Sequence, residues 1–164
     1  MADLILVSSV MHTGTRFLVR MLHRYSVPCR QIHTLDEKMK DIEELGAKRA
    51  AIPLRDPALC CVSHYNKPGF KTVPEICDFI ARQWDNLIEI EETMDHVHLR
   101  LDADDTLAEA QKVLRFCGCK KEIKEYPWFP VRNGYWPTAD YATWDEIKHE
   151  AEALTPYRER YNYG

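Results

Sequence analysis

The sequence lacks any run of 18 consecutive apolar residues, which is about the length that a helix needs to cross a bilayer. It also lacks an excess of positive charge, because 22 lysines and arginines stand against 26 aspartates and glutamates and give a net charge of −4. A surface that binds nucleic acid in general requires the opposite balance. We therefore predict neither a membrane-spanning protein nor a nucleic-acid-binding one.

The six cysteines lack the spacing of a disulfide framework and of a zinc site built from two CxxC pairs. We expect reduced and mostly buried thiols, which are typical of a cytoplasmic protein. The apolar stretch near the N-terminus is short and follows Asp3, so it does not resemble a signal peptide. These features predict a cytoplasmic location.

Strand-like and helix-like segments alternate along the chain. Short apolar segments predict strands at 4–10, 29–33, 49–54 and 97–101. Apolar residues at helical spacing predict helices at 15–25, 35–45, 57–65, 75–93 and 107–117. In a chain of 164 residues this pattern indicates one α/β domain over residues 1–164, with three α/β/α layers and a small central parallel sheet.

Three local features lead to narrower expectations. Pro53 lacks an N–H, so we expect it at a sheet edge or at the end of its strand. Residues 143–146 have the pattern of a capping box, which predicts a last helix that continues to about Leu154. His96 and His98 share one face of the fourth strand, and there we predict a solvated surface and no metal site.

The stretch from Leu4 to Leu18 changes from a strand pattern to a helix pattern across a short turn that contains Gly14. A helix that begins directly after a buried strand presents free backbone N–H groups and the positive end of its dipole. Such a helix start binds anions, most often phosphate. His12 and Arg16 flank Gly14 and would add positive charge. An ordinary βα unit without a ligand is the alternative.

Polar residues follow two other predicted strands, at the edge where an open α/β sheet binds its ligands. His33 closes the second strand, and Arg55 follows the third. A guanidinium is suited to hold an anion through two hydrogen bonds. Asp56-Pro57 is the pattern of a helix cap followed by proline at the first helical position. Ser63 lies two turns into that helix and would face the same anion if the helix crosses the site.

Two of these segments resemble motifs of the sulfotransferases. Residues 11–17, Met-His-Thr-Gly-Thr-Arg-Phe, are similar to the loop that holds the 5′-phosphosulfate of the donor in that family. Residues 55–65, which run from Arg-Asp-Pro to Ser63 and Tyr65, are similar to the segment that holds its 3′-phosphate. Softer matches at 99–118 and 157–164 extend the resemblance over most of the chain.

The resemblance implies a P-loop NTPase-like sulfotransferase fold and the donor 3′-phosphoadenosine 5′-phosphosulfate. The reaction would transfer a sulfuryl group to a hydroxyl or amine of a small-molecule or carbohydrate acceptor, release adenosine 3′,5′-bisphosphate and require no metal. The 5′ end of the donor would be held by His12, Thr13, Gly14, Thr15, Arg16 and Phe17. The 3′-phosphate would be held by Arg55 and Ser63, together with Arg132 and Gly134 of an Arg-Asn-Gly segment.

The resemblance also implies a histidine base that takes the proton of the acceptor. His33 is our candidate, because it follows the second strand, where many sulfotransferases place this residue, and because a neutral imidazole suits the task. His12 and His64 are alternative bases, and His33 could instead make only local hydrogen bonds. Phe17 has core packing as its alternative, and residues 132–134 have a plain turn.

The loop departs from the family pattern in two places. His12 stands where the family has lysine or arginine, and Arg16 replaces the second threonine. The chain is also shorter than typical members. A non-catalytic protein that binds a nucleotide or a partner on the same fold is therefore an alternative. A P-loop kinase of small molecules is a third possibility, although residues 14–16 lack the lysine that it needs.

Overall fold

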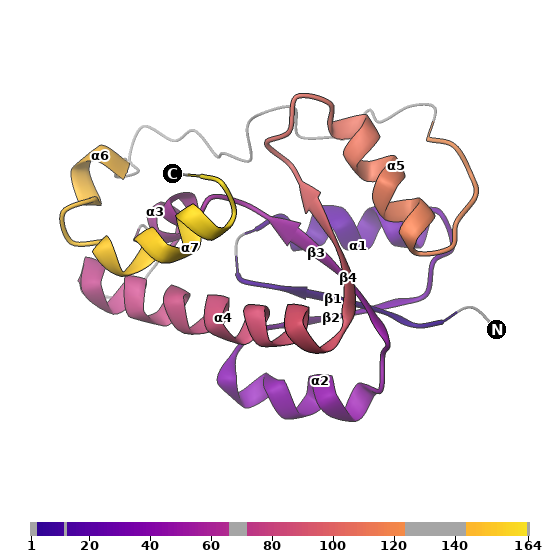
Figure 1. The fold of residues 1–164 in the computed structure, drawn as a ribbon, viewed down its shortest axis with the longest axis horizontal. Coiled ribbons are helices and arrows are strands. Elements are labelled where there is room, and N and C mark those ends of the chain that lie inside the picture. Colours follow the sequence, from indigo (N-terminus) through magenta and orange to yellow (C-terminus); the bar gives the residue numbers. More distant parts are fainter. Residues whose placement is uncertain (1–2, 12, 66–71, 124–143, 164) are drawn as a thin grey trace.

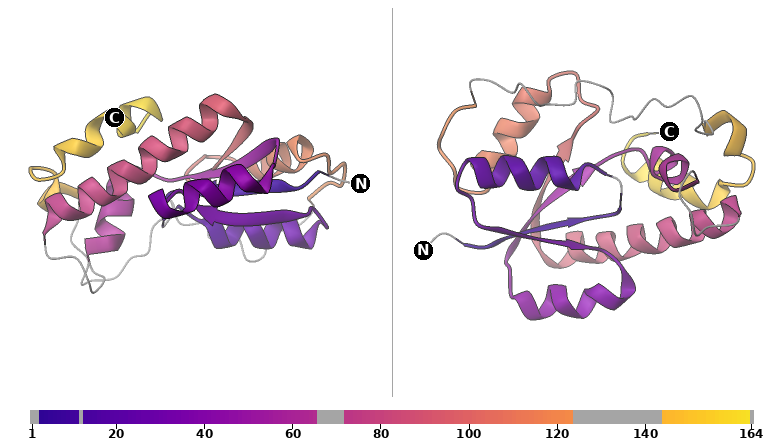
Figure 2. Two further views of the ribbon diagram at one scale, coloured as in Figure 1. Left: turned by 90° about the horizontal axis from the view of Figure 1, so that it is seen from below. Right: turned by 180° about the vertical axis from the view of Figure 1, so that it is seen from behind.

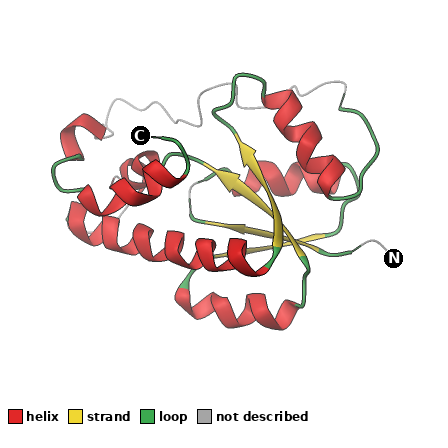
Figure 3. Ribbon diagram, in the orientation of Figure 1, coloured by secondary structure: helices red, strands yellow, loops and turns green. Residues whose placement is uncertain are grey.

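The computed structural model describes residues 3–11, 13–65, 72–123 and 144–163 (Figure 1). Its centre is a sheet of four parallel strands in the spatial order β2-β1-β3-β4 (Figure 3). The strands are β1 (Ile5–Ser9), β2 (Cys29–His33), β3 (Arg49–Leu54) and β4 (Asp95–Arg100). The predicted α/β class with a small parallel sheet is confirmed. Within the described ranges, no helix is both long and apolar enough to cross a bilayer.

Helices cover both faces of the sheet (Figure 2). One face carries α1 (Thr15–Arg24) and α5 (Thr106–Phe116). The other carries α2 (Met39–Leu45), preceded by a 3-10 turn at Asp36–Lys38, and α4 (Val73–Thr93). Successive residues of a strand point to opposite faces, so Ile5 and Val7 enter the first core and Leu6 enters the second. This explains why β1 is apolar along its length.

Three further helices, one before α4 and two near the end of the described residues, extend the core of the α4 face. They are α3 (Pro57–Tyr65), α6 (Trp144–Ile147) and α7 (Thr155–Arg160). The prediction of a single last helix is wrong. Helix α6 ends at Ile147, and a 3-10 turn at Glu152–Leu154 precedes α7. After Ile147, tight i→i−3 hydrogen bonds turn the chain at Glu150 and Ala151. Pro156 then lies in the first turn of α7, where a helix tolerates a residue without an N–H.

Pro53 shows how a proline is accommodated inside this sheet. Because β3 lies between β1 and β4, the expectation of a sheet edge is wrong. The expectation of a strand end is confirmed, since Pro53 is the penultimate residue of β3. The pairing of β1 with β3 stops at Ala51, whereas β4 pairs through to Leu54. At Pro53 the strand therefore has one neighbour, which lowers the cost of a missing N–H.

Candidate functional site

Gly14 shapes the loop between β1 and α1. Its φ of +96° lies in the left-handed region, which residues with a side chain rarely adopt. A Cβ at this position would also collide with the side chain of Leu101, the residue that follows β4. The loop thus favours glycine for two reasons, its left-handed φ and its contact with the end of the Leu101 side chain.

The start of α1 has no capping side chain among the residues that the structure describes. Gly14 is the N-cap residue, and the first turn of α1 contains no acidic residue. A helix start without a capping side chain favours an acceptor through the positive end of its dipole. Arg16 is exposed in the same turn, so its charge adds to the positive potential there.

Hydrogen bonds connect the start of α1 with His33. The register of β1 and β2 places Ser9 beside His33, and the Oγ of Ser9 lies 2.6 Å from Thr15 Oγ1 and 3.3 Å from His33 Nδ1. His33 Nδ1 also lies 3.3 Å from the carbonyl oxygen of Ser9. A carbonyl only accepts, so Nδ1 carries the hydrogen and Nε2 keeps its lone pair, 3.3 Å from the Nε2 of Gln31. Burial lowers the pKa of His33 below its ordinary 6.5, although the hydrogen bond to the Ser9 backbone raises it in part, and the ring is neutral at pH 7.

Gln83 of α4 is the second polar side chain that meets the loop. Its side chain is 1% exposed, and its Oε1 accepts a hydrogen bond of 2.9 Å from the backbone N–H of Met11. The Nε2 of the same amide is buried and has no hydrogen-bond partner in the described part of the chain. A buried donor without a partner is costly and rare. Gln83 therefore connects α4 to the loop through Met11 and keeps one donor that still needs an acceptor.

A polar network beside Gln83 holds the end of β2 in place. Thr34 donates from Oγ1 to the carbonyl of Gln83 at 2.9 Å and from its backbone N to the carbonyl of Ser9 at 3.1 Å. Asn86 donates from Nδ2 to the carbonyl of Thr34 at 2.9 Å and to Asp36 Oδ1 at 2.8 Å. The hydrogen bond from Asn86 lowers the pKa of Asp36, so its carboxylate stays ionised. Ser9 and Gln83 are therefore held in a fixed relation to each other.

Arg55 and Asp56 follow β3 and differ in their surroundings. Arg55 is 5% exposed, and Ser63 on α3 is 9% exposed. Asp56 caps α3, because its Oδ1 accepts from the backbone N–H of Ala58 at 2.9 Å, which confirms the predicted cap. The same carboxylate forms a salt bridge with Arg158 through two hydrogen bonds. Arg158 Nε donates to Oδ1 at 2.9 Å, and Arg158 Nη2 donates to Oδ2 at 3.3 Å. Helix α7 is thus fastened to the segment that carries Arg55.

The other residues that the sequence assigns to the donor site differ in their positions. Three of them lie outside the described residues: His12, Arg132 and Gly134. Thr13 is buried, and its hydroxyl donates to the carbonyl of Val10 at 2.8 Å. Its hydrogen is therefore used within the turn, and only its backbone N–H can donate to a ligand. Phe17 is 8% exposed within the apolar core of the α1 face, as its packing alternative predicts.

Three further histidines, His64, His96 and His98, are buried or half-buried. His64 is 2% exposed, and its ring meets Phe79 edge-on at 5.5 Å, so it is poorly placed to act as a base for an acceptor. His96 and His98 are half-buried beside α4. The predicted solvated strand face is found only in part, because Tyr161 of the C-terminal segment packs against His98 at 5.8 Å between ring centroids.

Reasoning from the sequence missed Ser9, Gln83 and Arg158. Ser9 and Gln83 each carry a signal, since one is a polar residue in an apolar strand and the other lies within the apolar face of a helix. Buried polar residues at such positions need partners, and this could have drawn attention to them. Arg158 carries no such signal, because its partner Asp56 is 102 residues away in the sequence.

Comparisons of the chain with protein-family models, with curated proteins and with solved structures each give no match. The interpretation of the site therefore depends on its geometry and on the two segments at 11–17 and 55–65. Both segments follow strands of one parallel sheet, and the carboxyl ends of parallel strands meet at one edge.

Proposed function

We propose that the chain is a compact sulfotransferase-like enzyme with the P-loop NTPase-like fold of that family. It would transfer a sulfuryl group from 3′-phosphoadenosine 5′-phosphosulfate to a hydroxyl or amine of a small molecule or carbohydrate. One observation carries the proposal: in the described part of the chain, α1 begins without a capping side chain or an acidic residue, and the buried Nε2 of Gln83 has no partner. An anion at the loop serves both. The resemblance of residues 11–17 and 55–65 to donor-binding motifs favours a phosphosulfate as that anion.

Each end of the donor has its own set of residues in this proposal. The backbone N–H groups of the first turn of α1, with Arg16, hold the 5′-phosphosulfate and stabilise the charge that develops on the leaving phosphate. Arg16 takes the place of the cation that the family has at position 12. Arg55 and Ser63 hold the 3′-phosphate, which distinguishes this donor from ordinary adenine nucleotides.

His33 is the base of the proposed reaction. As the acceptor oxygen bonds to sulfur, the bond from sulfur to the 5′-phosphate oxygen breaks and the proton of the hydroxyl moves to His33 Nε2. The Nδ1–H of the ring stays on the carbonyl of Ser9, which favours this tautomer. The six free cysteines are in keeping with the cytoplasmic location that forms part of the proposal.

Calorimetric titration with adenosine 3′,5′-bisphosphate, adenosine 5′-monophosphate and ATP with Mg²⁺ tests the donor site. We expect the bisphosphate to bind at least about tenfold more tightly than the monophosphate, because hydrogen bonds to a charged group contribute roughly 1.5–3 kcal/mol. Arg55→Ala should remove this preference, and Ser63→Ala should reduce it. Arg115→Ala, which changes an exposed arginine on α5, is the matched control and should leave it intact.

Each other outcome favours a different function. Equal affinity for the bisphosphate and the monophosphate would show that no 3′-phosphate site exists, and a preference for ATP with Mg²⁺ would indicate a kinase. Binding of the bisphosphate without any transfer to a panel of acceptors would indicate a non-catalytic protein. If transfer occurs, His33→Ala should abolish it without weakening bisphosphate binding. The wild-type rate should fall only below pH 6.5, because the lowered pKa keeps His33 neutral above that pH.

A further inference from the structure

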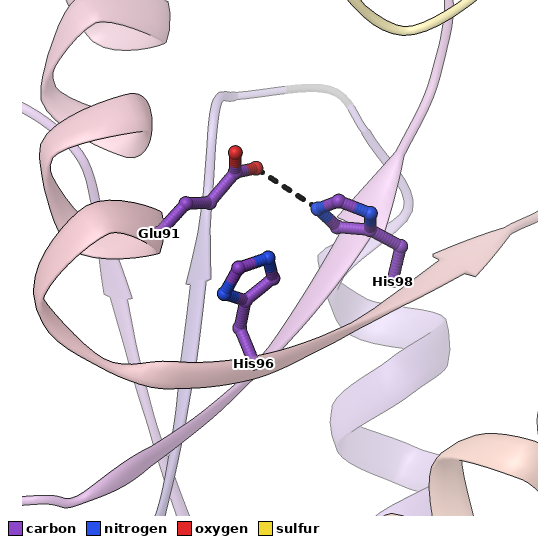
Figure 4. Close-up of side chains that lie close together, drawn as sticks. All are labelled: Glu91, His96 and His98. Atoms are coloured by element: carbon purple, nitrogen blue, oxygen red, sulfur yellow. Dashed lines mark hydrogen bonds and ion pairs between the residues drawn. The ribbon is translucent and has the colours of Figure 1, made fainter.

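Glu91, His96 and His98 form a compact cluster at the junction of α4 and β4 (Figure 4). Glu91 lies in the last turn of α4, and the two histidines lie two residues apart in β4, on the same side of the strand. One ligand atom of each residue lies within 4.8 Å of those of the other two. The closest pair is His98 Nε2 and Glu91 Oε1, at 2.9 Å.

Neighbouring residues hold these three side chains in position. The hydroxyl of Tyr161 donates to Glu91 Oε1 at 2.8 Å, and Arg160 approaches Glu91 Oε2 at 3.4 Å. His96 Nδ1 lies 3.1 Å from the carbonyl of Met94. Because this carbonyl accepts, Nδ1 carries the hydrogen, and the lone pair of His96 is left on Nε2. Metal-binding histidines are commonly oriented in this way, with the non-ligating N–H on a backbone carbonyl.

Burial distinguishes the cluster from an ordinary surface ion pair. The side chain of Glu91 is only 5% exposed, and that of His98 is 28% exposed. The rings of His96 and His98 lie 5.1 Å apart between centroids, and the ring of Tyr161 packs edge-on against His98. The carboxylate is thus held in the protein interior, while the imidazoles leave a path for a small ion from solvent.

We propose that Glu91, His96 and His98 bind a divalent transition-metal ion of the zinc class. Two imidazoles and one carboxylate form a ligand set that Zn²⁺ uses in proteins, and such a set leaves a fourth position for water. The ion replaces the hydrogen that lies between His98 Nε2 and Glu91 Oε1. That hydrogen moves to Nδ1 of His98 or to solvent. Since all three ligands lie within residues 91–98, the ion clamps the end of α4 to β4. This site is separate from the loop at Gly14 and does not depend on the proposed transfer reaction.

Zinc titration of the full chain tests the site, by calorimetry on chelator-treated protein in the presence of a reductant that does not bind metal. We expect a 1:1 complex with the wild type. His96→Ala and His98→Ala should each weaken it at least about tenfold, because loss of even an outer-shell partner costs about 10–100-fold in affinity. Glu91→Gln should weaken it as well. Zn²⁺ should also raise the melting temperature of the wild type, and this shift should shrink in both histidine variants.

Two control variants separate this site from adventitious zinc binding. His23→Ala removes an exposed histidine on α1, and Cys119→Ser removes a half-buried thiol; neither should change the affinity. His96→Asn, checked by circular dichroism, keeps a polar group on the strand if His96→Ala does not fold. The proposal is overturned if the wild type binds no Zn²⁺, if the histidine variants bind it as tightly as the wild type, or if binding is lost in Cys119→Ser.

Discussion

Helices α1 and α5 cover the same face of the sheet, and each follows a strand, yet they begin in opposite ways. Asp105 caps α5, and its side chain accepts a hydrogen bond of 2.9 Å from the backbone N–H of Ala108. α1 begins at Gly14, with no capping side chain among the described residues and no acidic residue in its first turn. A capping residue stabilises a helix by about 1 kcal/mol. At α1 no capping side chain of the described residues supplies this stabilisation.

The same contrast holds for α3 and α4, whereas the shorter helices α2 and α7 have no side-chain cap among the described residues. Asp56 caps α3, and Thr72 and Glu75 form a reciprocal capping box at the start of α4. Capping side chains are therefore a regular feature of the longer described helices, and α1 is the exception beside the loop that resembles a phosphosulfate-binding motif. This difference supports our proposal that α1 begins at an anion site.

The largest effect is expected from Gly14→Ala. The left-handed φ and the contact with Leu101 together should lower the free energy of unfolding by about 3 kcal/mol, measured by urea denaturation. Gly46→Ala is the matched control, because Gly46 has a φ of +67° and no atom within 4 Å of an added Cβ. It should cost about 1 kcal/mol. Equal losses in the two variants would show that Leu101 does not restrain the loop.

A smaller effect is expected from Asp105→Ala, which makes the start of α5 resemble that of α1. Loss of the cap should lower the free energy of unfolding by about 1 kcal/mol. Affinity for adenosine 3′,5′-bisphosphate, measured by calorimetry, should not change, because the cap of α5 serves stability alone. A parallel loss of affinity would mean that the two helix starts share one site.

The smallest effect on stability is expected from Arg16→Glu, which brings a negative charge to the start of α1. A carboxylate in the first turn should stabilise the helix by about 0.5 kcal/mol, and it should weaken bisphosphate binding because it repels the anion. Arg20→Glu, at an exposed position further along α1, should change both quantities less. Unchanged bisphosphate affinity in Arg16→Glu would place the anion elsewhere.

Much of the fold follows from local patterns. The strands and most helix boundaries were predicted within two residues, because the apolar periods are clear and Gly46 and Gly118 end their helices in left-handed conformations. The position of Pro53 inside the sheet was not predictable, because the lengths of two neighbouring strands decide it. The break after Ile147 was likewise missed, since a capping pattern does not show where a helix ends.

The candidate site was predictable where its residues are consecutive and not where they meet through the fold. Gly14 and Asp56 stand in local motifs, and the sequence identified the turn and the cap they form. Gln83 meets Met11 across 72 residues, and the salt bridge of Asp56 spans 102 residues. The sequence placed His96 and His98 on one strand face but missed Glu91 and Tyr161 beside them, because a strand pattern does not reveal which side chains of other segments pack there.

The salt bridge between Asp56 and Arg158 joins two segments that are synthesised at different times. The ribosome makes the protein from its N-terminus, so all four strands are synthesised before Arg158. Until α7 has been made, the Asp56 carboxylate can cap α3 but lacks its salt bridge to Arg158. The Arg-Asp-Pro segment therefore acquires its salt bridge to Arg158 only after the four described strands have been synthesised.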